Sequence, residues 1–108
     1  MPSATYALFK RAIRERKLIV CVYQGKRREV APHILGFKDK QEKALVYQFA
    51  GESNSVLPPG GEWRCLSLEA VERAEARDGE WRTGRYHRVT QQCIDIVDVD
   101  VNVPATLR

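Results

Sequence analysis

The feature that most constrains the fold is a series of β-type segments separated by turn signals. Residues 18–23 are aliphatic, β-branched or aromatic and stop at Gln24-Gly25, as expected of a strand that enters a hairpin. Residues 27–37 are predicted to form the returning strand. Pro32 restricts this strand to an edge or a bulged position, because proline donates no backbone hydrogen bond. Strongly bent strands of this kind are typical of small barrels.

Further segments of the same kind follow along the chain. Residues 44–50 show the period-two alternation of a third strand, with Tyr47 at its centre. Residues 51–61 are rich in Ser, Pro and Gly, which predicts a loop. The later elements are expected as a fourth strand over residues 63–68, a helical turn over residues 68–71 and a fifth strand over residues 71–76.

One amphipathic helix is expected before the strands. Ser3 or Thr5 can cap it, and apolar side chains then recur at helical spacing with basic side chains between them. The apolar positions are Leu8, Phe9, Ala12 and Ile13. We expect this apolar face to cover one end of the sheet, while the basic side chains face water or a ligand. The predicted class is mainly β: a small five-stranded barrel with an N-terminal helix and an additional C-terminal strand.

The additional strand is predicted from the alternation of apolar and acidic residues near the end of the chain. The phase of this alternation changes between Ile96 and Val97, which indicates a β-bulge. The strand exceeds the five that the barrel needs, and an unpaired strand favours pairing with another chain. One alternative is therefore an interaction or assembly module that forms a homodimer through residues Ile94 to Val103.

Composition sets limits on the class of protein. The chain has 108 residues, of which 44% are hydrophobic, so we expect one compact domain with little room for a deep catalytic cleft. We find no enzyme motif and no metal-ligand spacing, and therefore expect no catalytic residue, no metal and no cofactor. No apolar stretch approaches the ~20 residues of a membrane helix, and no secretion signal is apparent, so a cytoplasmic protein is expected. Cys21, Cys65 and Cys93 are widely spaced and odd in number, and we expect reduced thiols.

The positive charge is concentrated near the N-terminus. Residues 1–43 hold eleven basic and four acidic side chains, whereas residues 44–81 hold three and seven. A basic region of this kind suits a polyanion or nucleotide, although a solvated surface has the same composition. Two clusters could carry such binding: residues 26–28, with Arg27 and Arg28, and residues 81–88, where aromatic and basic side chains are interleaved as on surfaces that bind single-stranded nucleic acid. Packing of Trp81 and Tyr86 on the barrel is the other interpretation.

Four segments taken together resemble a known family. They are residues 13–23, residues 28–35 with the pattern R-x-V-x-P, residues 44–50 around Tyr47, and residues 63–71, in which Arg64 begins an R-x-hydrophobic-x-Leu pattern. This order is similar to the WYL domain of bacterial transcription and antiviral-defence regulators. We therefore expect a WYL-like barrel domain with its opening helix over residues 5–78 and a C-terminal extension over residues 79–108.

The resemblance implies a small Sm-like β-barrel, preceded by a helix, that senses a ligand. In the family this ligand is thought to be a nucleotide or single-stranded nucleic acid, held by basic and aromatic side chains without any reaction. By position, Arg28 matches the arginine of R-x-V-x-P, Tyr47 the central tyrosine of the naming motif and Arg64 the first arginine of the later strand. Arg27 and His33 lie near these positions and complete the expected ligand-binding set.

This sequence also departs from the family pattern. The naming Trp-Tyr-Leu is replaced by residues 46–48, Val-Tyr-Gln, and two positions that are often arginine hold Ser67 and Ala70. Loss of these cations would weaken phosphate binding or direct the pocket to another ligand. The chain shows no segment that fits the DNA-reading helix-turn-helix of family members, so we expect the domain to act through a protein partner.

Overall fold

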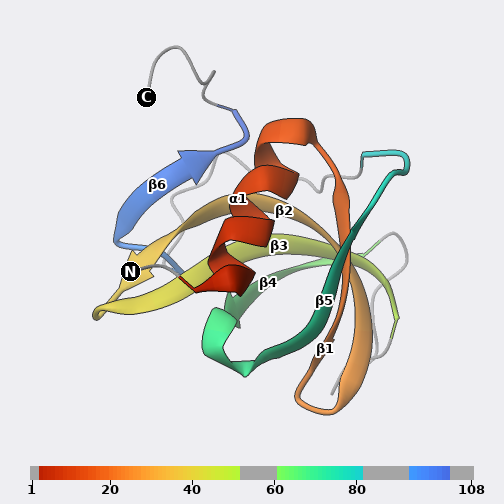
Figure 1. Cartoon of the computed structure of the whole chain (residues 1–108), viewed down its shortest axis with the longest axis horizontal. Coiled ribbons are helices and arrows are strands. Elements are labelled where there is room, and N and C mark those ends of the chain that lie inside the picture. The colour runs from red at the N-terminus through yellow and green to blue at the C-terminus, as the bar shows by residue number, and fades with distance from the viewer. Residues whose placement is uncertain (1–2, 52–60, 82–92, 103–108) are drawn as a thin grey trace.

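The computed structural model describes residues 3–51, 61–81 and 93–102 of the chain. Its elements are helix α1 (Ala4–Glu15), strands β1 (Leu18–Tyr23), β2 (Lys26–Lys38), β3 (Gln41–Gly51) and β4 (Glu62–Ser67), the short 3-10 helix η1 (Leu68–Ala70), and strands β5 (Val71–Arg77) and β6 (Ile96–Asp100). Figure 1 shows α1 lying across a strongly curved sheet. The predicted helix, hairpin and first five strands are therefore present at nearly the expected residues.

The described strands form one antiparallel sheet in the order β4-β3-β2-β1-β5, and β6 pairs with the second half of β2. This arrangement confirms the mainly β class. The prediction of a closed barrel is wrong, because the edge strands β4 and β5 are joined by η1 but form no ladder with each other in the described part of the chain. The sheet curls far enough, however, for the Ser67 amide at the end of β4 to donate a hydrogen bond of 3.1 Å to the hydroxyl of Tyr23 at the end of β1.

Strand β2 bends because its pairing with β3 is irregular. The register shifts between Glu29 and Val30 and again between Pro32 and Ile34, so that the β3 register skips His33. This confirms the bulged position that Pro32 predicts. The bend allows the first half of β2 to pair with β1 and the second half to pair with β6.

Helix α1 begins at a side-chain cap and covers the core of the sheet. Ser3 is the N-cap, and its hydroxyl accepts a hydrogen bond from the Tyr6 amide. Arg16 ends the helix in the left-handed conformation, with φ 52°. The buried side chains of the helix are those of Tyr6, Phe9, Ala12 and Ile13, which pack with inward residues of the strands. Tyr6 is the position that the apolar pattern missed.

Tyr6 ties α1 to β6. Its hydroxyl donates a 2.6 Å hydrogen bond to the carboxylate of Asp98, which also pairs with the Lys10 ammonium at 3.2 Å. Burial, together with this hydrogen bond, raises the pKa of Tyr6. The same hydrogen bond is the largest cause that lowers the pKa of Asp98, and Lys10 adds to it. Both shifts favour the observed pair of neutral phenol and ionised carboxylate.

Strand β6 belongs to the same sheet and is shorter than expected. It covers Ile96–Asp100, and its register with β2 shifts opposite Leu35 and Gly36, which leaves Asp98 as the bulged residue in place of the predicted step between Ile96 and Val97. The expectation that this strand is unpaired is wrong for one of its two edges, because β6 pairs with β2 along that edge. The close crossing requires Gly36, since a Cβ there would collide with the backbone carbonyl of Ile96. Val103 lies outside the described residues.

A disulfide joins β4 to the segment that leads into β6. Cys65 and Cys93 are bonded with their Cα atoms 5.6 Å apart, while Cys21 is a buried free thiol. The expectation of three reduced thiols is therefore wrong for two of them. A separation of 28 positions in the sequence hides the proximity of these cysteines, which arises because Cys93 and Ile94 pack against Ile34 and Leu45, opposite Cys65 in the β3–β4 ladder.

No helix in the described ranges has the length and apolar character needed to cross a membrane.

Reduction of the disulfide is expected to lower stability. Cross-linking two residues 28 positions apart stabilises a fold by about 3 to 4 kcal/mol when the main effect is on the unfolded chain. Urea unfolding of the wild type should shift to a lower midpoint in the presence of reductant. A Cys65→Ser/Cys93→Ser double variant serves as the control, because reductant should leave its midpoint unchanged. Equal midpoints of the wild type with and without reductant would contradict the prediction.

Substitution of Tyr6 is expected to change the pH dependence of stability. The Asp98 pKa is lowered on folding, so the pair stabilises the fold above the unfolded carboxyl pKa of about 3.9 and loses this effect as the pH falls through the folded value. The Tyr6 pKa is raised, so stability is also lost as the pH rises above about 10. Tyr6→Phe should cost about 1 to 2 kcal/mol at neutral pH, a range that allows for the partial exposure of Asp98.

The measurement is urea unfolding of wild type, Tyr6→Phe, Asp98→Asn and the double variant between pH 3 and 10.5. The double-mutant cycle isolates the coupling of the two side chains. Its coupling free energy should be largest between about pH 5 and pH 9. A coupling that stays constant across the whole range would show that the ionised carboxylate is not the partner that matters.

Candidate functional site

A pocket of about 310 Å³ lies between β4 and the end of the β1–β2 hairpin. Its walls are formed by Tyr23, Gln24, Arg28, Trp63, Arg64, Cys65 and Leu66. Two of the five predicted ligand-binding residues, Arg28 and Arg64, therefore meet at one cavity although they lie 36 positions apart. Curvature of the sheet brings them together, because β2 and β4 are separated in the sheet by the whole of β3.

Arg28 is the most unusual side chain of this pocket. Only 3% of it is exposed, because strand alternation places it on the inward face with Val30. Its guanidinium donates to the backbone carbonyl of Tyr23 at 3.3 Å, to the Gln48 side chain at 3.3 Å and to the Gln24 side chain at 3.5 Å. These distances are at or beyond the long end of the usual range of about 2.7 to 3.2 Å.

The partners of Arg28 are all neutral. The guanidinium lies 5.3 Å from the centre of the Tyr23 ring, and no carboxylate pairs with it among residues 3–51, 61–81 and 93–102. The charge of Arg28 affects the pKa of Cys21, which lies opposite Arg28 on β1. Burial raises the pKa of the Cys21 thiol to about 11, and Arg28 acts in the opposite direction. The inward end of the pocket is therefore electropositive.

Arg64 lies on the opposite wall, on β4. It is paired across the sheet with Val46, on the same face as Leu66, and its side chain is 23% exposed. Its guanidinium contacts the Glu62 carboxylate at 2.9 Å. Arg64 thus contributes a charge at the wall of the pocket that is already partly balanced, whereas Arg28 contributes a buried charge that is not.

The outer edge of β4, which pairs with no other strand in the described part of the chain, adds backbone donors to this wall. The amide of Ser67 points away from β3, since it donates to the Tyr23 hydroxyl. Amides two residues apart on a strand point to the same side, so that of Cys65 is directed toward the same edge, and Cys65 lines the pocket. Two guanidinium groups and a strand edge therefore face one cavity, an arrangement suited to an anion.

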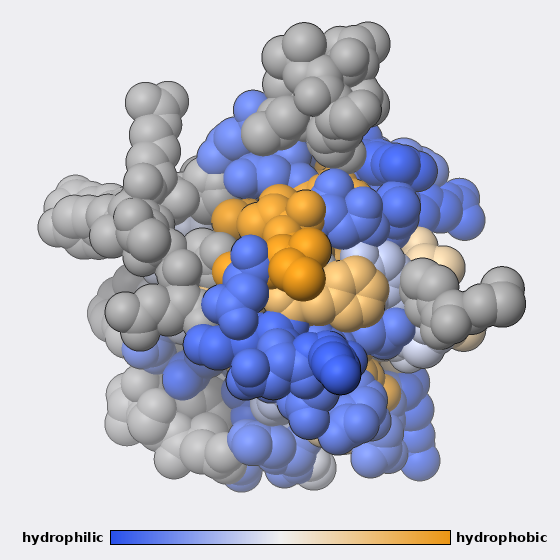
Figure 2. All heavy atoms as spheres, turned by 90° about the vertical axis from the view of Figure 1, so that its left-hand side faces the viewer, coloured by the Kyte–Doolittle hydropathy of each residue, from blue (hydrophilic) through white to orange (hydrophobic). Residues whose placement is uncertain are grey.

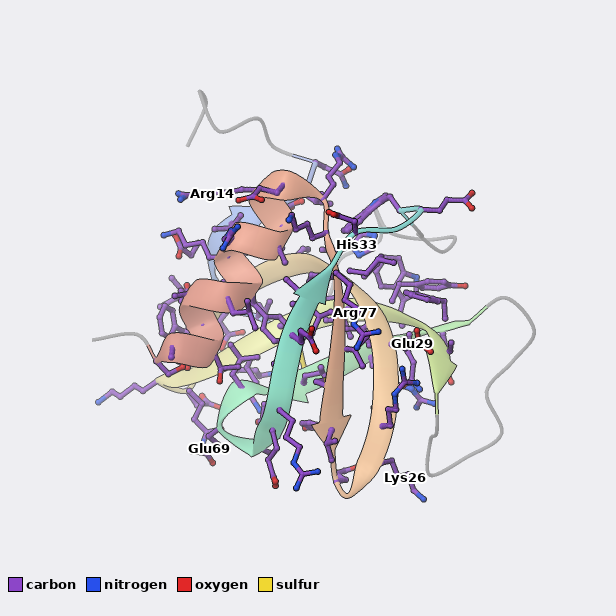
Figure 3. All side chains as sticks on the ribbon, turned by 45° about the vertical axis from the view of Figure 1, so that its right-hand side comes forward. Arg14, Lys26, Glu29, His33, Glu69 and Arg77 are labelled. Carbon is purple, nitrogen blue, oxygen red and sulfur yellow. A yellow bond between two sulfur atoms is a disulfide. The ribbon has the colours of Figure 1, made fainter. Side chains whose placement is uncertain are left out.

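Tyr47 and His33 lie on the other face of the sheet. Trp63 connects the two regions, because it lines the pocket and also contacts both rings, with centroid distances of 5.2 Å to Tyr47 and 4.7 Å to His33. Trp81 packs on His33 at 4.9 Å. His33 is 1% exposed, with Nδ1 2.7 Å from the Ala31 carbonyl oxygen. We call these four rings the outer aromatic cluster, and in Figure 3 His33 lies far along β2 from Lys26 at the hairpin tip.

Arg27 points away from the pocket. It is exposed on the outward face of β2 and pairs with the Glu29 carboxylate at 3.2 Å. Ser67 is bonded through its hydroxyl to the Lys43 ammonium at 2.6 Å, and Ala70 is exposed on η1. Arg27 is thus adjacent to Arg28 in sequence but opposite to it in orientation.

Sequence reasoning missed several residues of the site. Gln48 is fully buried and accepts from Arg28, and Tyr23 and Gln24 contact the same guanidinium. A signal for Gln48 was present, since period-two alternation places it on the inward face with Ala44 and Val46, where an unpartnered amide would be costly. Tyr23 and Gln24 carried no such signal, because they read as the end of a strand and its turn.

The second predicted cluster is only partly placed by the structure. Of residues 81–88, only Trp81 is described, and the guanidinium of Arg16 lies 5.7 Å from its ring centre. The basic side chains of that cluster lie outside the described residues. In the ranges that are described, no group of three His, Cys, Asp or Glu side chains could hold a metal ion.

Comparisons of the chain with protein-family models, with curated proteins and with solved structures found no match.

Removal of the Tyr23 hydroxyl is expected to loosen the contact between β1 and β4. Tyr23→Phe leaves the Ser67 amide without its acceptor and should cost about 1 kcal/mol in urea unfolding. Hydrogen exchange of the Ser67 amide should become faster. Tyr47→Phe is the matched control, because the structure gives the Tyr47 hydroxyl no hydrogen-bond partner among the described residues, and its loss should stay within about 0.5 kcal/mol. Equal losses in the two variants would contradict the assigned contact.

Proposed function

We propose that this chain is a non-enzymatic ligand-sensing domain that binds a nucleotide or single-stranded nucleic acid in the pocket between β4 and the β1–β2 hairpin. The observation that supports it is the Arg28 guanidinium, which is 3% exposed, has only neutral partners in the described structure and lines a pocket of about 310 Å³. A cavity of this size is at the lower end of the range typical of small-ligand sites.

Burial of the Arg28 cation costs free energy, because the charge loses its hydration. A buried charge is stable only when it is paired or well hydrogen-bonded, and three long contacts to neutral groups meet this need poorly. A phosphate that enters the pocket would supply oxygens to the planar fork of Arg28 and would also reach Arg64. Trp63 and Tyr23 border the same cavity and offer aromatic faces against which a base or sugar can stack.

The resemblance to WYL domains agrees with this proposal. The opening helix and the strand order β4-β3-β2-β1-β5, with a 3-10 turn before the last of these strands, are the features in favour of an Sm-like order of elements, in a sheet that is not closed into a barrel. Arg28 and Arg64 are two of the three residues that the resemblance marks for ligand binding. In this proposal the domain acts in the cytoplasm as part of transcription regulation. Ligand binding changes its interaction with a protein partner.

The role of Tyr47 in this proposal is indirect. Its ring contacts Trp63 from the outer face at a centroid distance of 5.2 Å, so it holds the Trp63 side chain at the wall of the pocket. His33 contacts Trp63 in the same way at 4.7 Å. A tryptophan that already contacts two rings loses little further side-chain entropy when a ligand stacks on it, which favours binding.

Arg28→Gln is expected to weaken binding of single-stranded DNA or RNA at least tenfold, because a charge-assisted contact is worth about 1.5 to 3 kcal/mol. Arg27→Gln is the matched control, since it removes the same charge one residue away on the outward face and should change binding less than about threefold. The measurement is fluorescence anisotropy with short single strands and duplex DNA over a salt series, with circular dichroism to verify the fold.

Arg64→Gln is a second variant that changes a less buried side chain and keeps the test valid if Arg28→Gln does not fold. Selective, salt-sensitive binding of single strands that depends on Arg28 or Arg64 would support the proposal. Equal effects of the Arg27 and Arg28 variants would assign the binding to general surface charge. Absence of binding to any nucleotide or nucleic acid would overturn the proposal.

A second candidate function is an assembly module, for which β6 gives a specific observation. Ile96 and Val97 are 67% and 48% exposed, and Figure 2 shows apolar side chains gathered on the face of the molecule that carries β6. Exposed apolar side chains next to a sheet edge are typical of protein interfaces. A homodimer through residues 94–103, detected as concentration-dependent sedimentation in a chain that binds no nucleic acid, would favour this candidate.

A further inference from the structure

We propose that the pocket recognises a terminal phosphate monoester, that is, the phosphorylated end of a nucleotide or of a single strand, in preference to the internal phosphodiesters of the chain. This inference rests on the proposed function and specifies its ligand. Three properties of the pocket support it: the depth at which Arg28 lies, the volume of the cavity and the charge of its walls.

Depth decides which part of a ligand can reach the guanidinium. Arg28 is 3% exposed, with Tyr23, Gln24 and Gln48 around it, and it lines the cavity, so a ligand group can reach it only from the pocket. A terminal phosphate enters such a site end-on, because it has a substituent on one side only. An internal phosphate has a sugar on each side, and both sugars would have to enter with it.

The volume of the cavity also favours a terminal phosphate over an internal one. The cavity of about 310 Å³ is at the lower end of the range typical of small-ligand sites. A phosphate and the one sugar attached to it suit a cavity of this volume. A phosphate with two sugars and their bases exceeds it, so the base of the terminal nucleotide would lie at the rim, where Trp63 is available for stacking.

Charge distinguishes the two phosphate types further. The pocket is lined by Arg28 and Arg64, and none of its seven described lining residues is acidic. Glu62 balances part of the charge of Arg64 from outside that lining. A phosphate monoester has a charge of about −1.5 to −2 at pH 7 and three acceptor oxygens, whereas a diester has a single charge and two unsubstituted oxygens. The monoester therefore matches two guanidinium groups and the Cys65 amide better.

The experiment compares single strands that differ only at one end. Eight-residue DNA strands of one sequence carry a 5′-phosphate, a 3′-phosphate, a 5′-phosphate capped as its methyl diester, or hydroxyls at both ends, and each competes with a labelled strand for the wild-type chain. At least one monoester end should bind ten times more tightly than the hydroxyl-ended strand. The methyl cap should remove this advantage, since it changes the charge of the end and adds only one methyl group.

Two further comparisons locate the effect. Arg28→Gln or Arg64→Gln should reduce the ratio between phosphorylated and hydroxyl-ended strands toward one, while Arg27→Gln should keep it. Adenosine monophosphate should compete at least ten times better than adenosine. The preference should also grow between pH 5 and pH 7.5, because the second pKa of the monoester lies near 6.

The outcomes separate this inference from the function on which it rests. Equal affinity of all four strands, still dependent on Arg28 or Arg64, overturns the terminal-phosphate inference and leaves the proposed function standing. Absence of binding by every strand and by adenosine monophosphate overturns both. Inorganic phosphate that competes as well as adenosine monophosphate also overturns the inference, because the site would then select phosphate without its nucleoside. Since the comparison of strand ends uses the wild-type chain, it does not depend on the folding of any variant.

Discussion

The bend of β2 is the constraint on which the rest of the structure depends. Two shifts of register against β3, one of them where the ladder passes from Pro32 to Ile34, let a single strand of 13 residues pair with β1, β3 and β6. The resulting curvature carries β4 around to the end of β1, where Ser67 and Tyr23 are hydrogen-bonded. It also places β6 within reach of Tyr6, so that α1 is tied to the same sheet.

The local elements could be predicted from the sequence because their signals are local. The cap at Ser3, the turn at Gln24-Gly25 and the bulge at Pro32 each follow from the chemistry of one or two residues. The lack of a ladder between β4 and β5 in the described residues, the pairing of β6 with β2 and the Cys65–Cys93 disulfide depend on how distant segments meet. The alternation of apolar residues and the turn signals are local, so they do not predict contacts between segments that are far apart in the sequence.

The candidate site was predictable to a similar degree. Arg28 and Arg64 were singled out through a family pattern, and they line one pocket. Tyr47 and His33 were singled out with them, but strand alternation and the bulge at His33 put both rings on the outer face. The partners of Arg28 show why the site could be predicted only in part. Gln48 can be recognised in the sequence, because it is a polar residue at a position where the strand alternation expects an apolar one. The contact with Tyr23 cannot, because its acceptor is a backbone carbonyl, which no pattern of side chains reveals.

The pocket exists because the barrel is not closed. If β4 and β5 were paired, the amides along the outer edge of β4 would be used in a ladder and could not donate to a ligand. In the open arrangement that edge and two guanidinium groups remain directed at one cavity. The charge of Arg28 is then held at a cost by neutral partners. An anion that relieved this cost would stabilise the fold as it bound, which links occupancy of the pocket to the strength of the contact between β1 and β4.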